Sequence, residues 1–308
     1  MFPLHRELEP HAQLNESEGF ALHRFGSVLR GVRSVMLRYL LPAVAALLVA
    51  EPVTAQVGAD LNISPKRVVF SAGERSATVY IFNQGDLPAT YTVELVDRVM
   101  TPDGRIVATD EAPDVQIDSA RDLVQHTPRR ITLQPRTSQA IRVRARPGGA
   151  AAGEHRTHLT VTALPPETTG FTVDQAAAGA ADEVSLQVVA LFSVSIPVIV
   201  RDGPVDARAD IDRVSIRREG QQDLLSLDLV RLGANSVYGD IEVMSEGAGG
   251  RQLLTAVRGV AVYPEVERRT VVIALPQPPV AGQALTIVYR DDDTTRGEVL
   301  ATATLVAP

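Results

Sequence analysis

The stretch from residue 187 to residue 201 constrains the fold most, because it is long, largely apolar and rich in β-branched side chains. Side chains of a β-strand point alternately to opposite faces. From Val184 to Val200 every even position is apolar, whereas the odd positions mix serine, glutamine and proline with apolar residues. This alternation predicts one strand over residues 184–201 with one continuous apolar face.

A proline near the end of this segment indicates where the strand lies in its sheet. Pro197 has no amide hydrogen to donate to a neighbouring strand, which favours a sheet edge. Proteins normally protect long apolar edge strands, so one that is kept is typical of a strand donated to a partner. The alternative is a strand buried inside the protein's own core, and this segment alone leaves both possibilities open.

Short apolar segments separated by turn residues make up most of the remaining chain, and no amphipathic helix is evident. Seven segments at this spacing predict an immunoglobulin-like β-sandwich over residues 56–202. Its predicted strands are residues 61–70, 76–83, 89–99, 129–133, 138–145, 155–163 and 184–201. Gly203 and Pro204 then interrupt the pattern.

A second, smaller β-sandwich is predicted over residues 203–308, so the predicted fold class is all-β with two sandwich domains. Its predicted strands are residues 209–217, 224–232, 239–245, 251–263, 270–274, 284–289 and 299–306.

Residues 1–55 are predicted to be an N-terminal extension and a signal peptide. Basic residues up to Arg38 precede an apolar core at residues 40–50, and small residues up to Ala55 suit cleavage. The mature chain would then begin at Gln56. Met36 stands where a signal peptide would naturally start and is an alternative initiator. The apolar core is shorter than the roughly 20 residues of a membrane-spanning helix, so we expect export without stable membrane insertion.

Charge and cysteine content exclude several classes of protein. The chain has 30 lysine and arginine residues against 37 aspartate and glutamate residues, so it lacks the basic excess of a nucleic-acid-binding protein. With no cysteine, an exported protein must fold without disulfides. Lys66 is its one lysine, so arginines supply the other cationic side chains, and arginine suits bidentate binding of carboxylates.

No pattern predicts a catalytic, metal or cofactor site. His155 and His158 lie three residues apart on a predicted strand and so point to opposite faces, which disfavours a shared metal. His126 is predicted to lie in a loop. The acidic residues 291–293 could suit calcium, but we predict that they form a solvated hairpin turn.

Five segments, taken in their order, resemble the periplasmic pilus-assembly chaperones of the chaperone–usher pathway, the PapD-like family, and in particular its archaic branch. They are residues 63–70, 79–83, 153–159, 195–201 and 231–239. The resemblance covers essentially the whole chain after residue 55. It implies two immunoglobulin-like domains in an L-shaped arrangement, a periplasmic location and a role in fimbrium biogenesis.

The resemblance also implies a mechanism. In this family the long strand of the first domain completes the incomplete immunoglobulin-like fold of a pilus subunit, which is then delivered to an outer-membrane usher. The side chains implied to enter the groove of the subunit are those of Val184, Leu186, Val188, Ala190 and Phe192.

A basic pair in the family anchors the terminal carboxylate of the subunit. By position its arginine matches Arg67, but Pro197 stands where its lysine is expected. Either a second arginine substitutes for this lysine or the anchor differs in kind. The candidates for a second arginine are Arg156 and Arg201, and we favour Arg156. The alternative for each arginine is an ordinary salt bridge at the surface or between the domains.

The predicted function is that of a periplasmic chaperone for pilus subunits, with no enzymatic activity. The alternative is an exported two-domain structural or adhesion protein that donates no strand. Such a protein would be monodisperse alone and would bind no subunit with an exposed groove.

Overall fold

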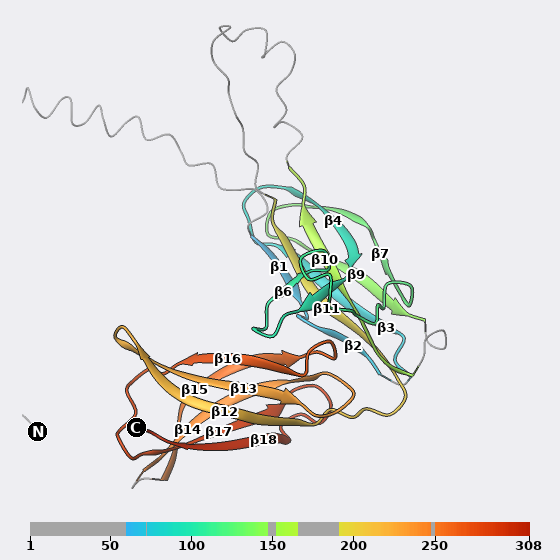
Figure 1. Ribbon diagram of the computed structural model, residues 1–308. Helices are drawn as coiled ribbons and strands as arrows, with labels where there is room; N and C mark the ends of the chain where they lie inside the picture. The colour runs from blue at the N-terminus through green and yellow to red at the C-terminus, as the bar shows by residue number, and fades with distance from the viewer. Residues whose placement is uncertain (1–59, 72, 147–151, 166–190, 248–249) are drawn as a thin grey trace, which may run out of the picture. The chain divides into compact units, whose positions relative to one another are not determined.

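The computed structural model describes residues 60–308 except residue 72 and residues 147–151, 166–190 and 248–249. Every regular element in these described parts is a β-strand, which confirms the predicted all-β fold class. Figure 1 shows the strands in two groups, β1–β11 and β12–β18. The predicted signal peptide and residues 184–190 of the predicted long strand lie outside the described residues.

Two facing sheets form the first sandwich, one in the order β1-β3-β9-β7 and the other in the order β2-β11-β10-β4-β8. The strands are β1 Leu61–Ser64, β2 Val68–Phe70, β3 Ser76–Asn83, β4 Ala89–Val96, β7 Val124–Thr127, β8 Arg130–Leu133, β9 Ser138–Ala145, β10 Gly153–Ala163 and β11 Ser193–Asp202. Alternate apolar side chains point inward, such as Val79 and Ile81 of β3 and Leu159 and Val161 of β10. Their mutual burial forms the first core.

The predicted strand over residues 61–70 is in fact two strands in different sheets. β1 pairs with β3, whereas β2 pairs in parallel with β11. Pro65 lies between them, and because proline cannot donate to a ladder it favours a break at this point. The change of sheet places Arg67 at the start of β2, beside β11.

The predicted strand over residues 89–99 breaks at Asp97, which separates β4 from β5 (Arg98–Met100). β5 forms a small hairpin with β6 (Ile106–Ala108), a strand that the sequence prediction lacks, and we call it the β5–β6 hairpin. β7 pairs with β9, so His126 lies in a strand and not in the predicted loop. This strand has four residues, of which Val124 alone is a buried apolar residue, so its alternation is too short to recognise.

The second sandwich contains every strand predicted for it, with ends that differ by a few residues at most. Its sheets have the orders β12-β13-β16 and β15-β14-β17-β18. The strands are β12 Ala209–Glu219, β13 Gln222–Arg231, β14 Val237–Gly247, β15 Gly250–Val262, β16 Arg268–Ala274, β17 Ala284–Asp291 and β18 Val299–Val306.

Side chains from the β5–β6 hairpin and β11 take part in the second core. Met100 and Ile199 are 2% and 0% exposed and belong to the apolar cluster of the second sandwich. The amide of Met100 donates a hydrogen bond of 2.8 Å to the Glu265 carboxylate, and the amide of Thr270 donates one of 2.9 Å to the carbonyl oxygen of Pro102. The hairpin therefore packs against the second sandwich.

Candidate functional site

β11 has a free edge over its first half. On one side it pairs with β10 along its whole length, residues 193–202. On the other side β2 covers only residues 198–200. In the described part of the chain, no strand pairs with this side of residues 193–197. Pro197 is the last residue of β11 before the pairing with β2 begins. Because no strand lies beside it on this side, its missing amide hydrogen removes no hydrogen bond between strands.

The inward face of β11 loses its cover toward this free half. Val198 and Ile196 are 0% and 2% exposed in the first core, whereas Val194 is only partly buried at the margin of that core. Phe192 lies on the same face just before the strand and is also partly buried. An apolar face thus continues past the core that it helps to form, and such a face suits a partner.

Phe192 is the one predicted groove residue that lies in a described part. Its carbonyl oxygen accepts a hydrogen bond of 2.9 Å from the amide of Ala163, so it extends the pairing with β10. Val184, Leu186, Val188 and Ala190 lie outside the described residues. Their contact with a subunit stays a prediction.

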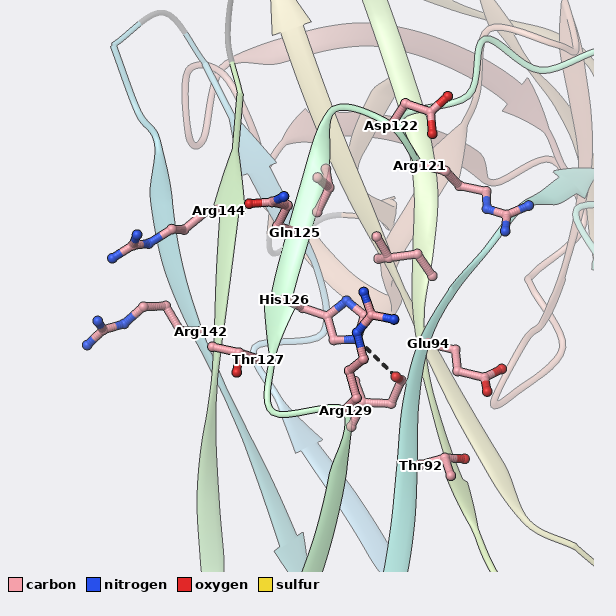
Figure 2. A pocket seen from close by; sticks show the side chains of 13 residues that line it. Thr92, Glu94, Arg121, Asp122, Gln125, His126, Thr127, Arg129, Arg142 and Arg144 are labelled. Atoms are coloured by element: carbon pink, nitrogen blue, oxygen red, sulfur yellow. Dashed lines mark hydrogen bonds between the residues drawn. The ribbon is translucent and has the colours of Figure 1, made fainter.

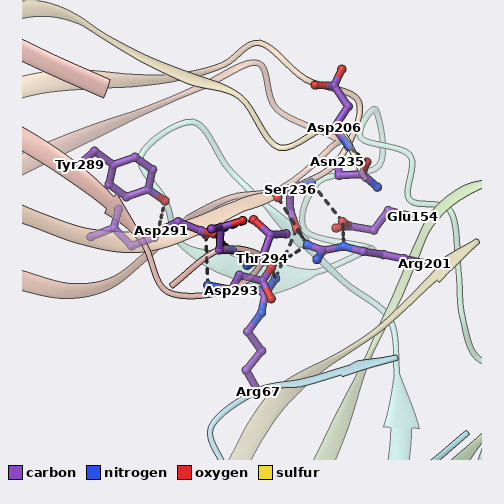
Figure 3. A network of polar contacts seen from close by, with 12 residues as sticks. Arg67, Glu154, Arg201, Asp206, Asn235, Ser236, Tyr289, Asp291, Asp293 and Thr294 are labelled. Atoms are coloured by element: carbon purple, nitrogen blue, oxygen red, sulfur yellow. Dashed lines mark hydrogen bonds and ion pairs between the residues drawn. The ribbon is translucent and has the colours of Figure 1, made fainter. Parts of the chain in front are cut away.

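A buried cluster of charged side chains lies at the other end of β11 (Figure 3). Arg201 donates from Nε to Glu154 at 2.8 Å and from Nη2 to Asp293 at 2.7 Å. The same oxygen of Asp293 accepts a hydrogen bond of 2.8 Å from Arg67 Nη2. The amide of Ser236 donates to Glu154 at 3.1 Å. Two guanidinium groups and two carboxylates therefore balance one another.

Arg201 is the centre of this cluster, and its side chain is 2% exposed. Burial lowers its pKa, but the neighbouring Glu154 and Asp293 carboxylates outweigh burial and raise the pKa above its ordinary value. Arg201 is therefore a fixed cation. Its removal would leave two buried carboxylates without their main partner.

Arg67 uses only part of its hydrogen-bonding capacity. Its Nη2 contacts Asp293 and, at 3.4 Å, the hydroxyl of Ser236. Its Nε and Nη1 are buried and have no hydrogen-bond partner in the described structure. The guanidinium lies 4.7 Å from the ring centre of Tyr238 and 5.9 Å from that of Tyr263. The unpaired donors are of the type that binds a carboxylate.

Arg156 lies in a separate cluster. Its guanidinium donates to both oxygens of Glu265, one of them at 3.0 Å, and at 3.0 Å to the carbonyl oxygen of Arg98. It also stacks on Tyr263, 3.7 Å from the ring centre. The structure thus brings Arg67 together with Arg201, through a shared aspartate, and not with the favoured Arg156. All three arginines form salt bridges, and their role in binding a subunit carboxylate stays a prediction.

The acidic residues 291–293 lie at the start of the predicted hairpin turn, which joins β17 to β18, but the side chains of Asp291 and Asp293 are buried and not solvated. Asp291 is 2% exposed, and its carboxylate accepts hydrogen bonds from the amides of Asp293 and Thr294 at 3.1 and 2.9 Å. These bonds hold the loop that carries Asp293, whose carboxylate meets the arginines. Asp292 forms a surface pair with Arg296 at 2.8 Å. Adjacent carboxylates usually mark solvated turns, so no local signal reveals the burial.

The described parts of the chain contain no group of three or more histidine or acidic residues placed to hold a metal ion. They also contain no helix that could span a membrane.

Comparisons with known proteins give likenesses in structure. No protein-family model matches the chain, and no curated protein matches it. The chain is similar to the YadV chaperone, with 14% identity and a TM-score of 0.41 over 80% of this chain and 100% of that chain. It is similar to the Escherichia coli chaperone DraB, with 16% identity and a TM-score of 0.38 over 80% and 96% of the two chains.

A third similar structure is the CsuC–CsuE complex of a chaperone with a tip adhesion subunit, from the archaic chaperone–usher Csu pili of Acinetobacter baumannii. The identity is 15% and the TM-score 0.40, over 78% of this chain and 96% of that chain.

Proposed function

We propose that the protein is a periplasmic chaperone that binds pilus-type subunits with an incomplete immunoglobulin-like fold and delivers them to an outer-membrane usher. The free edge of β11 over residues 193–197 is the observation that carries this proposal. A free edge presents main-chain donors and acceptors to an added strand. The apolar face that continues to Phe192, and in sequence to Val184, would fill the groove of the subunit.

The arginine cluster supplies the anchor in this proposal. Arg67 would receive the terminal carboxylate of the subunit on its unpaired Nε and Nη1, which requires these buried atoms to become accessible on binding, while Asp293 and Arg201 hold its other side. The carboxylate of Glu265 already binds Arg156 through both of its oxygens, so we assign Arg156 to joining the hairpin and the two sandwiches.

Replacing Phe192 by Asp tests strand donation. An unpaired charge in an apolar groove costs several kcal/mol, so co-expression with a groove-exposed pilus subunit and pull-down should yield no complex. Thermal unfolding should change little, because Phe192 lies outside the first core.

Leu191→Asp is the matched control, because Leu191 is the neighbouring residue, 55% exposed and on the opposite face. Equal loss of capture in both variants would contradict the assigned face. Unfolding of the isolated Phe192→Asp variant would show that the face is core, as expected for a structural or adhesion protein that donates no strand.

Replacing Arg67 by Ala tests the anchor. A charge-assisted hydrogen bond contributes about 1.5–3 kcal/mol, so the affinity for the subunit should fall roughly ten- to a hundredfold. The affinity is measured by titrating the pilus subunit with each chaperone variant. Arg156→Ala and Arg201→Ala are compared in the same way, after circular dichroism has shown that they fold. Undiminished capture by folded Arg67→Ala protein would rule out this anchor.

A further inference from the structure

A hollow of about 940 Å³ lies at one edge of the first sandwich, between β4 and β7 (Figure 2). We call it the basic hollow, because its lining includes four arginines, namely Arg121, Arg129, Arg142 and Arg144. Figure 2 shows Arg142 and Arg144 on one side of β7 and Arg121 on the other. It is distinct from β11 and from the arginine cluster described above.

The four arginines differ from most exposed arginines of this protein. Arg105, Arg136 and Arg208 each form a salt bridge of 2.7 Å or less with a nearby aspartate. By contrast, none of the four arginines of the basic hollow forms a salt bridge within the described part of the chain. Their guanidinium groups are therefore available to an acidic ligand.

The basic hollow is positive on a protein whose net charge is −7. Its lining includes two acidic residues, Glu94 and Asp122, so four arginines leave an excess of two positive charges. Burial lowers the pKa of His126, and its Nε2 donates a hydrogen bond of 2.9 Å to the carbonyl oxygen of Val93. His126 is thus neutral near pH 7, and the excess comes from arginine alone. A local excess of this sign attracts anionic ligands.

Two unpaired strand edges border the basic hollow. β8 covers β4 only from Ala89 to Thr92, and β7 pairs with β9 alone among the described strands. The amide of Val93 donates to the carbonyl oxygen of Arg129 at 2.9 Å, and its carbonyl oxygen accepts from His126. Because peptide groups of alternate residues point the same way in a strand, that of Leu95 also points to this side. Free strand edges bind extended peptides.

We propose that the basic hollow binds an extended acidic segment of a partner protein. The arginines on the two sides of β7 would pair with carboxylates, and the free edge of β4 would bond the main chain of the segment. An extended peptide brings both kinds of group, whereas a simple anion brings only charge. The proposal does not depend on the donation of β11, because the two sites lie on different strands.

The probe is a fluorescent peptide of alternating glutamate and threonine, whose carboxylates lie on one face when it is extended. Its binding to the full chain is followed by fluorescence anisotropy, with a glutamine–threonine peptide as the uncharged comparison. We expect binding of the acidic peptide alone. The double variants Arg121→Ser with Arg129→Ser and Arg142→Ser with Arg144→Ser should each weaken binding about tenfold.

The matched control is Arg217→Ser with Arg251→Ser, which removes the same charge from exposed sites of the second sandwich. It should leave binding unchanged. Equal weakening by this control would show that binding follows net charge and would overturn the proposal. Two further outcomes would overturn the proposal. In one, inorganic tripolyphosphate binds the basic hollow as tightly as the peptide does; in the other, neither double variant of the hollow changes the binding of the peptide. Since all six arginines are exposed, each variant should fold, which circular dichroism checks.

Discussion

His158 makes stability depend on pH at the scale of a single residue. It is 3% exposed on β10, and burial, with the charges of Arg156 and Arg98, lowers its pKa to about 3. In the unfolded chain its pKa is about 6.5. Between these values the unfolded state binds a proton that the folded state does not, so stability is full above the unfolded pKa and falls as pH decreases.

We therefore predict that the His158→Gln variant loses part of this pH dependence. Lowering the pH from 7 to 5 should cost the native protein about 2 kcal/mol more than the variant. Urea unfolding at both pH values measures the difference. Partial burial also lowers the pKa of His126, and His126→Gln gives the comparison for its share of the pH dependence. Equal pH dependence of native protein and His158→Gln would contradict the assignment.

At the scale of elements, the β5–β6 hairpin belongs to the first half of the chain but packs on the second core through Met100. Replacing Met100 by Ala should destabilise the second sandwich by about 2–5 kcal/mol, because it leaves a cavity there. Hydrogen exchange should rise in β13 and β16, although the substitution lies far away in the sequence. Ile106→Ala is the control, since Ile106 is 37% exposed in the same hairpin. Faster exchange confined to the first sandwich would refute this role.

Elements with a long alternation were predictable from sequence, and those shaped by tertiary contacts were not. The bounds of β3, β9 and β18 match the predicted segments, because eight residues with one inward face give a clear period of two. The break between β1 and β2 was missed although Pro65 lies in it, because only three residues separate the two strands and it is their pairing with different sheets that distinguishes them.

The site was predictable to a smaller extent. Arg67 and Arg201 were found through a resemblance, but Glu154, Glu265 and Asp293 were not selected. The pair of Arg67 with Asp293 joins residues 226 positions apart, and no local pattern encodes such a contact. Only the assembled sheets reveal which acidic side chains meet the arginines.

At the scale of the whole molecule, buried contacts join the described strands of both sandwiches. Glu265 binds Arg156 and the amide of Met100, with side-chain exposures of 3% and 2% for the ion pair. Glu265→Ala should cost about 3–5 kcal/mol, because it leaves Arg156 as an uncompensated buried charge. The double variant with Arg156→Met should recover part of this loss.

Calorimetry measures both the loss of stability in Glu265→Ala and its partial recovery in the double variant. The native chain should unfold in a single transition, because each sandwich contributes to the burial of the other. Two separate transitions in the native protein would show that the pair does not couple the sandwiches. So would a double variant whose loss of unfolding free energy equals the sum of the losses in the two single variants.

The long register between β10 and β11 has a mechanical consequence. Hydrogen bonds in an antiparallel pair are perpendicular to the strands, so a pull along β11 loads all of them in shear and not one after another. A partner strand added to the free half would pull along the same axis. A load on such a strand would therefore pass into the whole β10–β11 ladder at once.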